Sequence, residues 1–331
     1  MTTTSTTAAS DGNGSVIHDI GYKPYTGTRL GRAHIVRALY FFSLRAAFGF
    51  GRSARARIIP LATFALMMLP AAVSIYKVAD VGGSLPLPYT HYAYNTSLLF
   101  FLFVAVAAPE LVSRDLRHHT LPLYFSRPLR RADYPLAKLL ALATAIVLFE
   151  GLPLVAMYLG TIASSTSGSG VWAQTRDLVP GLLVALAYGL LFAPLTLLIA
   201  STTGRRALAT GAIAILLLAT TAISHVLESV GTHGDGPPPV AVTQGPGAQQ
   251  GPDTNPPPFK ETITYNGIAR NGGLVDPLRL VEGTRIWAFH ATDGNIPDPQ
   301  GAGGLYAAEL ILLTGLTAGG LYLRYRKVGV A

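Results

Sequence analysis

The chain has 331 residues, of which 50% are hydrophobic and only 13% are charged, and its formal net charge is +8. Soluble globular domains usually contain about 25% charged residues, so the composition excludes that class and indicates an integral membrane protein. The basic residues lie beside apolar runs and not in one patch interleaved with aromatic residues, which argues against nucleic-acid binding. There is no cysteine, which excludes disulfides, thiolate metal sites and cysteine nucleophiles.

Residues 1–34 are predicted to form a disordered cytoplasmic segment. Their start, MTTTSTTAASDGNGSVIHDI, lacks the basic and then apolar regions of a cleaved signal peptide. Residues 35–57 are apolar enough for a helix, yet they carry an arginine every seven or eight residues. Arg37, Arg45 and Arg52 share one side of such a helix, which predicts that it lies in the membrane interface. It would act either as an anchor on anionic lipid or with an added mechanical role.

Six apolar runs have the length that a membrane-spanning helix needs, about 20 residues. Spans one to five fall within residues 58–228, and the sixth opens the C-terminal segment 304–331, which ends in a cytoplasmic tail. The runs are residues 58–78, 89–112, 136–162, 178–201, 207–228 and 304–323. The expected fold class is therefore an all-α polytopic membrane protein with six transmembrane helices.

The basic residues predict the orientation of the spans. With the N-terminus inside, 19 of the 25 Lys and Arg residues fall in cytoplasmic segments. The short outer loops, residues 79–90 and 161–177, hold only Arg176, and short loops are where the positive-inside rule is most reliable. Arg outnumbers Lys 20 to 5, a bias typical of GC-rich bacterial genomes. We therefore expect a bacterial plasma membrane protein with both termini cytoplasmic.

The outer loop between spans five and six, residues 229–303, is long and changes in composition. Residues 231–258 hold eight prolines and six glycines and form a low-complexity stretch that cannot bury a core. Residues 259–303 are predicted to form a small ordered cap, in which KETITYNGIA has strand-like alternation with an Asn-Gly turn and LVDPLRLVEGTRIWAFH has a helical period. A passive loop is the alternative, since length alone does not give a loop a role.

The sequence lacks the common catalytic motifs. There is no Gly-Lys dipeptide, and hence no Walker A loop to hold nucleotide phosphates. His118 and His119 are adjacent, so on a helix they point to different faces and make a poor metal pair. We expect neither a metal site nor a cofactor in this chain, and we do not expect it to be an enzyme.

Glu150 is the one carboxylate predicted to lie deep within a span. An ionised side chain at that depth costs at least about 2.5 kcal/mol and usually faces protein or water. It is either a substrate-contacting or proton-exchanging carboxylate, or a buried glutamate satisfied by neighbouring polar groups.

Two polar stripes are predicted at the outer ends of spans five and two. They are Thr221, Ser224, His225 and Glu228 on span five, and His91, Tyr94 and Asn95 on span two. The helical spacing puts each stripe on one face, so the two could line an external vestibule or could instead bond neighbouring helices. The candidate substrate-pathway residues are Tyr94, Asn95, Glu150, Thr221, Ser224 and His225.

The stretch between spans two and three is the most informative motif. Reading ELVSRDLRHHTLPLYFSRPLRRADYPLAK from Glu110 to Lys138, it holds six of the 25 Lys and Arg residues within 29 positions. Its first part is a charged turn made of Glu110, Arg114, Asp115 and Arg117. At a helix exit such side chains can reach water or dock on another protein.

This motif resembles the cytoplasmic loop of ABC-2 type transporter permeases. In that family an acidic residue ends span two, a Thr-Leu pair follows a charged turn, and a Ser-Arg-Pro segment precedes a Lys that opens span three. The matching positions are Glu110, Thr120, Leu121, Ser126, Arg127, Pro128 and Lys138. YTGTRLGR, residues 25–32, is similar to the N-terminal segment of bacterial members, and the topology is similar over the whole chain.

The resemblance implies that residues 114–123 form a coupling helix within the loop 113–137 and that residues 35–57 form a connecting helix. Both would touch a separate ATPase subunit that binds ATP and Mg²⁺. The coupling residues it implies are Glu110, Arg114, Asp115, Arg117, Thr120, Leu121 and Arg127, with Arg37, Arg45 and Arg52 on the connecting helix. A full exporter would pair two permease chains, identical or sister, with two ATPase chains, and substrate would cross between the permeases.

Other classes remain open. An ATP-independent secondary transporter or channel usually has internal repeats and several intramembrane charges, whereas this sequence has one deep carboxylate and no convincing repeat. A membrane-embedded enzyme needs a converging acid, base or metal set, for which only Glu150, His225 and Glu228 offer a start. A regulatory protein with the outer loop as its sensor is a third alternative.

Overall fold

A computed structural model describes residues 27, 30–51, 54–81, 85–118, 124, 129–164, 168–233, 267–290 and 302–328. Within these ranges the chain is helical and has no strand, and six helices are long and apolar enough to cross a membrane. They are α2 (Ala54–Val81), α4 (Ser97–Arg117), α6 (Asp133–Ser164), α7 (Gly168–Ala200), α8 (Arg206–His233) and α11 (Gly303–Val328). The predicted all-α fold with six candidate spans is confirmed.

The N-terminal helix differs from its predicted bounds. Helix α1 (Arg32–Ala47) begins three residues before the predicted position 35 and ends ten before position 57. It ends there because Gly49 and Gly51 adopt φ angles of 76° and 83°, a left-handed conformation that glycine tolerates and that stops a helix. The first span then starts at Ala54, inside the segment predicted as interfacial. Most of the predicted disordered segment lies outside the described residues.

The second span, by contrast, begins later than predicted. Residues 89–95 form the 3-10 helix η1 (Tyr89–His91) and the short helix α3 (Tyr92–Asn95), and α4 starts at Ser97. The Thr96 hydroxyl donates to the carbonyl oxygen of Tyr92 at 2.8 Å, a local bond of the kind that competes with a regular helix. The polar outer end of the predicted span is therefore a separate element.

Helices α6 and α7 are much longer than a span requires. They have 32 and 33 residues, or about 48 Å each at 1.5 Å per residue, against a hydrocarbon core of about 30 Å. The two helices pack along each other. The predicted outer loop 161–177 is consequently almost all helix.

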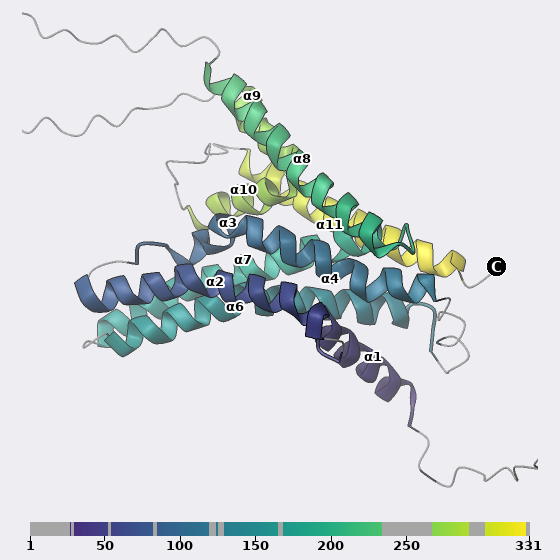
Figure 1. Cartoon of the computed structure of the whole chain (residues 1–331). Coiled ribbons are helices and arrows are strands. Elements are labelled where there is room, and N and C mark those ends of the chain that lie inside the picture. The colour runs from purple at the N-terminus through teal and green to yellow at the C-terminus, as the bar shows by residue number, and fades with distance from the viewer. Residues whose placement is uncertain are drawn as a thin grey trace, which may run out of the picture.

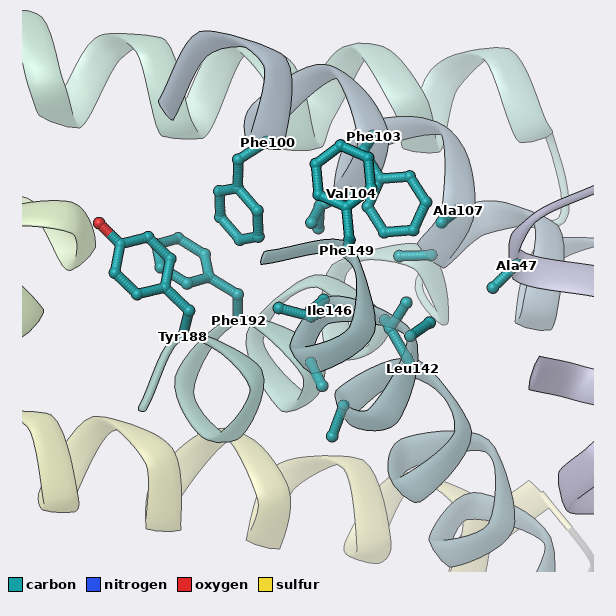
Figure 2. Packing of buried hydrophobic residues seen from close by; sticks show 14 of the residues in the cluster. Ala47, Phe100, Phe103, Val104, Ala107, Leu142, Ile146, Phe149, Tyr188 and Phe192 are labelled. Carbon is teal, nitrogen blue, oxygen red and sulfur yellow. The ribbon is translucent and has the colours of Figure 1, made fainter. Parts of the chain in front are cut away.

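An aromatic core joins α4, α6 and α7 (Figure 2). The rings of Phe103 and Phe149 stack with centroids 4.1 Å apart, and Phe100 meets Phe192 edge to face at 4.9 Å. Tyr188 closes the cluster against Phe100. By contrast, α2, α8 and α11 leave most of their apolar surface uncovered. The chain thus has a well-packed centre and three loosely covered spans.

The two ends of the bundle differ (Figure 1). One end is formed by helix α1, the end of α4, the start of α6 and the C-terminal part of α11. We call it the α1 end. The other, the α10 end, carries α3 and the helices between spans five and six: α9 (Gly267–Gly272), η2 (Gly273–Val275) and α10 (Pro277–Phe289).

The loop between spans five and six is described over residues 267–290, and the strand-like residues 260–265 lie outside the described part. Where the alternation of KETITYNGIA continues into described residues, the chain is the helix α9. The predicted helical period is confirmed by α10, which packs against α7, α8 and α11. The low-complexity stretch lies outside the described residues except for the last turn of α8.

The contact between α6 and α7 can be tested at Gly189. A Cβ atom there would lie 2.9 Å from the carbonyl oxygen of Ala143, which is backbone and cannot easily move. Gly189→Ala should therefore lower the free energy of unfolding by about 1 to 3 kcal/mol, the range for overpacking. Gly315→Ala is the control, because its Cβ meets nothing within 4 Å and a helical alanine gains up to about 1 kcal/mol. Unfolding in mixed micelles measures both; equal effects would contradict the packing.

Candidate functional site

Glu110 is the centre of a charged cluster at the α1 end. It lies near the end of α4, and only 7% of its surface is exposed. Its Oε2 lies 3.1 Å from Nη1 of Arg206, and its Oε1 lies 4.0 Å from Nη1 of Arg114. Arg206 is the first residue of α8, so this pair ties the end of span two to the start of span five.

Asp115 connects α4 to α6 in the same region. Its Oδ2 accepts a hydrogen bond from the Tyr134 hydroxyl at 2.7 Å and lies 3.0 Å from Nζ of Lys138. Lys138 is only 3% exposed, and its ammonium also lies over the Tyr134 ring. The Tyr134 ring in turn meets Tyr325 of α11. One carboxylate thus organises the ends of three spans.

A third ion pair fixes α1 to the bundle. The Arg32 guanidinium donates to both carboxylate oxygens of Asp133, at 2.6 and 2.5 Å. The hydrogen bond to Asp133 raises the pKa of Arg32 further above its usual value. Such two-point pairing sets geometry as well as charge, so it orients α1 against the start of α6.

A cavity of about 510 Å³ lies between α1, α4 and α6. Its polar wall carries the charged groups just described, and its outer rim carries the exposed aromatic residues Phe42 and Phe50. The residues that line it include Glu110, Arg114, Asp115, His118, Tyr124 and Lys138. A hollow with this mixture of aromatic and charged groups can receive part of another protein.

The structure gathers some of the predicted coupling residues and leaves others undescribed. Arg114 and Arg117 are exposed at the end of α4, and Asp115 turns inward to Lys138. On α1, Arg37 and Arg45 are exposed. The predicted coupling residues Thr120, Leu121 and Arg127, and Arg52 of the connecting helix, lie outside the described residues.

A second charged cluster forms at the α10 end around Arg279. Its Nη2 donates to Oε2 of Glu228 at 2.7 Å, and its guanidinium lies 5.1 Å above the centre of the Tyr94 ring. Arg279 is 3% exposed. It therefore lies between the two predicted polar stripes, one on α8 and one at the start of span two. Arg279 was not singled out from the sequence, although a charged residue within a helical apolar period was the available signal.

The buried face of α10 carries further charge. Its N-cap Asp276 accepts a hydrogen bond from the backbone N–H of Leu278 at 3.0 Å, and burial raises the pKa of Asp276. One turn further, Arg285 Nε donates to Oε2 of Glu282 at 2.7 Å, and both side chains are fully buried. Since a lone buried charge is very costly, these pairs are what allow the helix to lie within the bundle.

The remaining stripe residues have different surroundings. Ser224 is buried and Thr221 half-buried, whereas His225 is exposed with Nδ1 at 3.6 Å from Glu228. Asn95 is exposed and donates to the carbonyl oxygen of His91 at 2.9 Å. Among the described residues no group of three or more His, Cys, Asp or Glu side chains could hold a metal ion.

Glu150 has no comparable partner. It is fully buried in α6, and neither carboxylate oxygen has a hydrogen-bond partner in the described part of the chain. The Tyr188 hydroxyl is likewise buried without a hydrogen-bond partner among those residues. The sequence left open whether neighbouring polar groups satisfy Glu150, and within the described residues no such hydrogen bond forms.

The buried pair of Asp115 and Lys138 can be tested by a double-mutant cycle. Lys138→Met removes the buried cation that lies 3.0 Å from Asp115 and should cost about 3 kcal/mol, because breaking one side of a buried pair is strongly destabilising. Adding Asp115→Asn removes both charges and should recover most of the loss. The control is Arg176→Gln, which removes an exposed arginine at the other end and should change stability by less than about 0.5 kcal/mol. Additive losses in detergent unfolding would refute the coupling.

No protein-family model matches the chain, and no curated protein matches it.

Proposed function

We propose that this chain is the membrane-spanning permease subunit of an ATP-binding cassette exporter, coupled to a separate ATPase subunit. It works in the bacterial plasma membrane with both termini and the α1 end cytoplasmic. The observation that carries the proposal is the charged cluster at the end of α4. There Glu110 and Asp115 link this helix to α8 and α6, beside a cavity whose rim is formed by α1.

The cluster gives a mechanical reason for the proposal. A partner that pushes on the segment after α4 acts on a helix end that is ion-paired to the first residue of α8 and to α6. Because α8 is otherwise sparsely covered by its own chain, a small displacement at its start can change its tilt. A bistable arrangement of α8 against the α4–α6–α7 core would then alternate access to the pathway.

In this proposal the energy comes from ATP bound by a partner subunit. The chain has no Gly-Lys dipeptide to form a Walker A loop, so ATP and Mg²⁺ would be bound by two copies of the partner. The loop from Glu110 to Lys138, which resembles that of ABC-2 type permeases, would be the docking segment. In the described part of this loop the exposed cations are Arg114, Arg117, Arg130 and Arg131, and Arg37 and Arg45 extend the basic surface onto α1.

A second permease chain, identical or a sister, completes the pathway in this proposal. The spans α2, α8 and α11 leave large apolar faces outside the core, more than the better-buried α4, α6 and α7. Such faces can contact either lipid or another helix, and a dimer would use part of them. The polar residues of the α10 end, including Tyr94, Asn95, Thr221, Ser224 and His225, would then face the outer part of the pathway.

The coupling role is tested by expressing the chain alone and together with an ABC ATPase subunit from a neighbouring gene. The isolated chain should show no ATP turnover, whereas the co-expressed complex should hydrolyse ATP. Arg114→Gln should leave the permease folded, because Arg114 is exposed, and should raise the ATPase concentration for half-maximal assembly by about threefold to tenfold. Arg176→Gln, at the opposite end, is the control. ATP hydrolysis by the isolated chain, or equal assembly of both variants, would remove the proposal.

Glu150 favours a second candidate, an ATP-independent secondary transporter or channel. A buried carboxylate without a partner is typical of proton relays and ion pathways. In that case, transport in vesicles should follow an imposed proton gradient without any ATPase, and Glu150→Gln should reduce it by at least about tenfold. The exporter proposal expects no such gradient dependence.

A further inference from the structure

A groove of about 1160 Å³ lies at the α1 end between α2, α4 and α8. It is separate from the cavity beside α1 and opens on the other side of α4. Three arginines, Arg117, Arg205 and Arg206, line it together with apolar residues that include Ile59 and Val106. Among the described residues that line the groove, none is acidic.

The fold brings these arginines together from two segments. Arg117 ends α4, and Arg205 and Arg206 lie at the turn into α8. The approach is close, since a Cβ on Gly204 would lie 3.5 Å from the backbone of Arg117. The first turn of α8 adds the partial positive charge of a helix N-terminus to the same place. The groove therefore has a strongly positive end.

Most of this charge has no protein partner. Arg206 shares its charge with Glu110 at 3.1 Å. Arg117 and Arg205 are exposed, and neither forms an ion pair within the described part of the chain. Two cations facing an open groove call for an anionic ligand from outside the chain.

The rest of the groove suits a hydrocarbon chain. Ile59 is exposed on α2, and Gly211 of α8 leaves open space where a side chain would otherwise stand. The apolar surface continues from there along α8, where Leu208 and Ile215 are exposed. A soluble anion would bind the arginines but would not cover the apolar surface. A phospholipid would contact the arginines with its headgroup and the apolar surface with an acyl chain.

We propose that the groove binds an anionic phospholipid from the membrane leaflet at the α1 end. Its phosphate and headgroup lie against Arg117, Arg205 and Arg206, and an acyl chain runs along Ile59 and Gly211. Basic pockets between transmembrane helices bind such headgroups, and the gain from two unpaired arginines predicts a preference of at least about tenfold over a zwitterionic lipid. The site shares Arg117 with the proposed docking segment, but lipid binding needs no ATPase and is measured on the chain alone.

Fluorescence quenching by brominated lipid tests the proposal. A reporter chain carries Ile59→Trp, with Trp172→Phe and Trp287→Phe to remove the other tryptophans, both of which are exposed. In phosphatidylcholine vesicles, brominated phosphatidylglycerol should quench the reporter with a relative binding constant about tenfold above that of brominated phosphatidylcholine. Arg117→Gln together with Arg205→Gln should bring the ratio to about one, and this pair leaves the bond between Arg206 and Glu110 intact. Arg176→Gln should keep the tenfold ratio.

Three outcomes overturn the proposal. They are equal quenching by the two lipids in the reporter chain, an unchanged ratio in the double arginine variant, and displacement of the lipid by millimolar inorganic phosphate, which would indicate a soluble anion. A second measurement needs no tryptophan variant. The unmodified chain purified from mixed vesicles should retain more phosphatidylglycerol than its double arginine variant by mass spectrometry, and equal retention also refutes the site.

Discussion

The pairing of Lys138 with Asp115 is the constraint on which the α1 end depends. An ammonium with 3% exposure cannot remain in an apolar bundle without a partner, since the desolvation penalty is several kcal/mol. The start of α6 must therefore stay in register with the end of α4. The pair of Glu110 and Arg206 extends that register to α8, and the pair of Arg32 and Asp133 extends it to α1. Charge pairing, more than apolar contact, decides how these elements meet.

The same principle acts at the α10 end, but the middle of the bundle is held differently. Arg279 binds Glu228 and covers Tyr94, so it fastens α10 to α8 and α3. Between the two ends, stacked rings such as Phe103 and Phe149 hold α4, α6 and α7 by close packing. Helix α8 takes part in the ion pairs at both ends through Arg206 and Glu228, and it has no Phe, Tyr or Trp to add to the aromatic centre. In Figure 1 it diverges from the bundle. Of the long helices, α8 is therefore the one best suited to change its tilt relative to α4, α6 and α7.

The sequence predicted the features that depend on a local pattern, which are the spans and the charged turn. It did not predict the ion pairs between residues far apart in the chain. Apolar run length located all six spans, and a charged turn marked Glu110 and Asp115. Arg206 lies far along the chain from Glu110, and no periodicity relates them; the same holds for Arg279 and Glu228. Helix α10 carries Arg279, Glu282 and Arg285, charged residues that are usually exposed, yet pairing with Glu228 and with each other allows them to be buried. Gly49 and Gly51 could have predicted that α1 ends near residue 48. The prediction extended the helix to residue 57 because the segment is apolar.

Most buried charges described above are paired with an opposite charge, whereas Glu150 is not. Its position in the bundle explains why it cannot reach one. It follows Phe149, whose ring stacks in the best-packed part of the bundle, so the side chain cannot move to either charged end without breaking that packing. Its oxygens and the Tyr188 hydroxyl are buried without hydrogen-bond partners among the described residues. Unsatisfied groups in a rigid core cost stability at rest and gain the most from a polar ligand or a proton. The best-packed part of the bundle is thus also where a proton or a polar ligand would lower the free energy most.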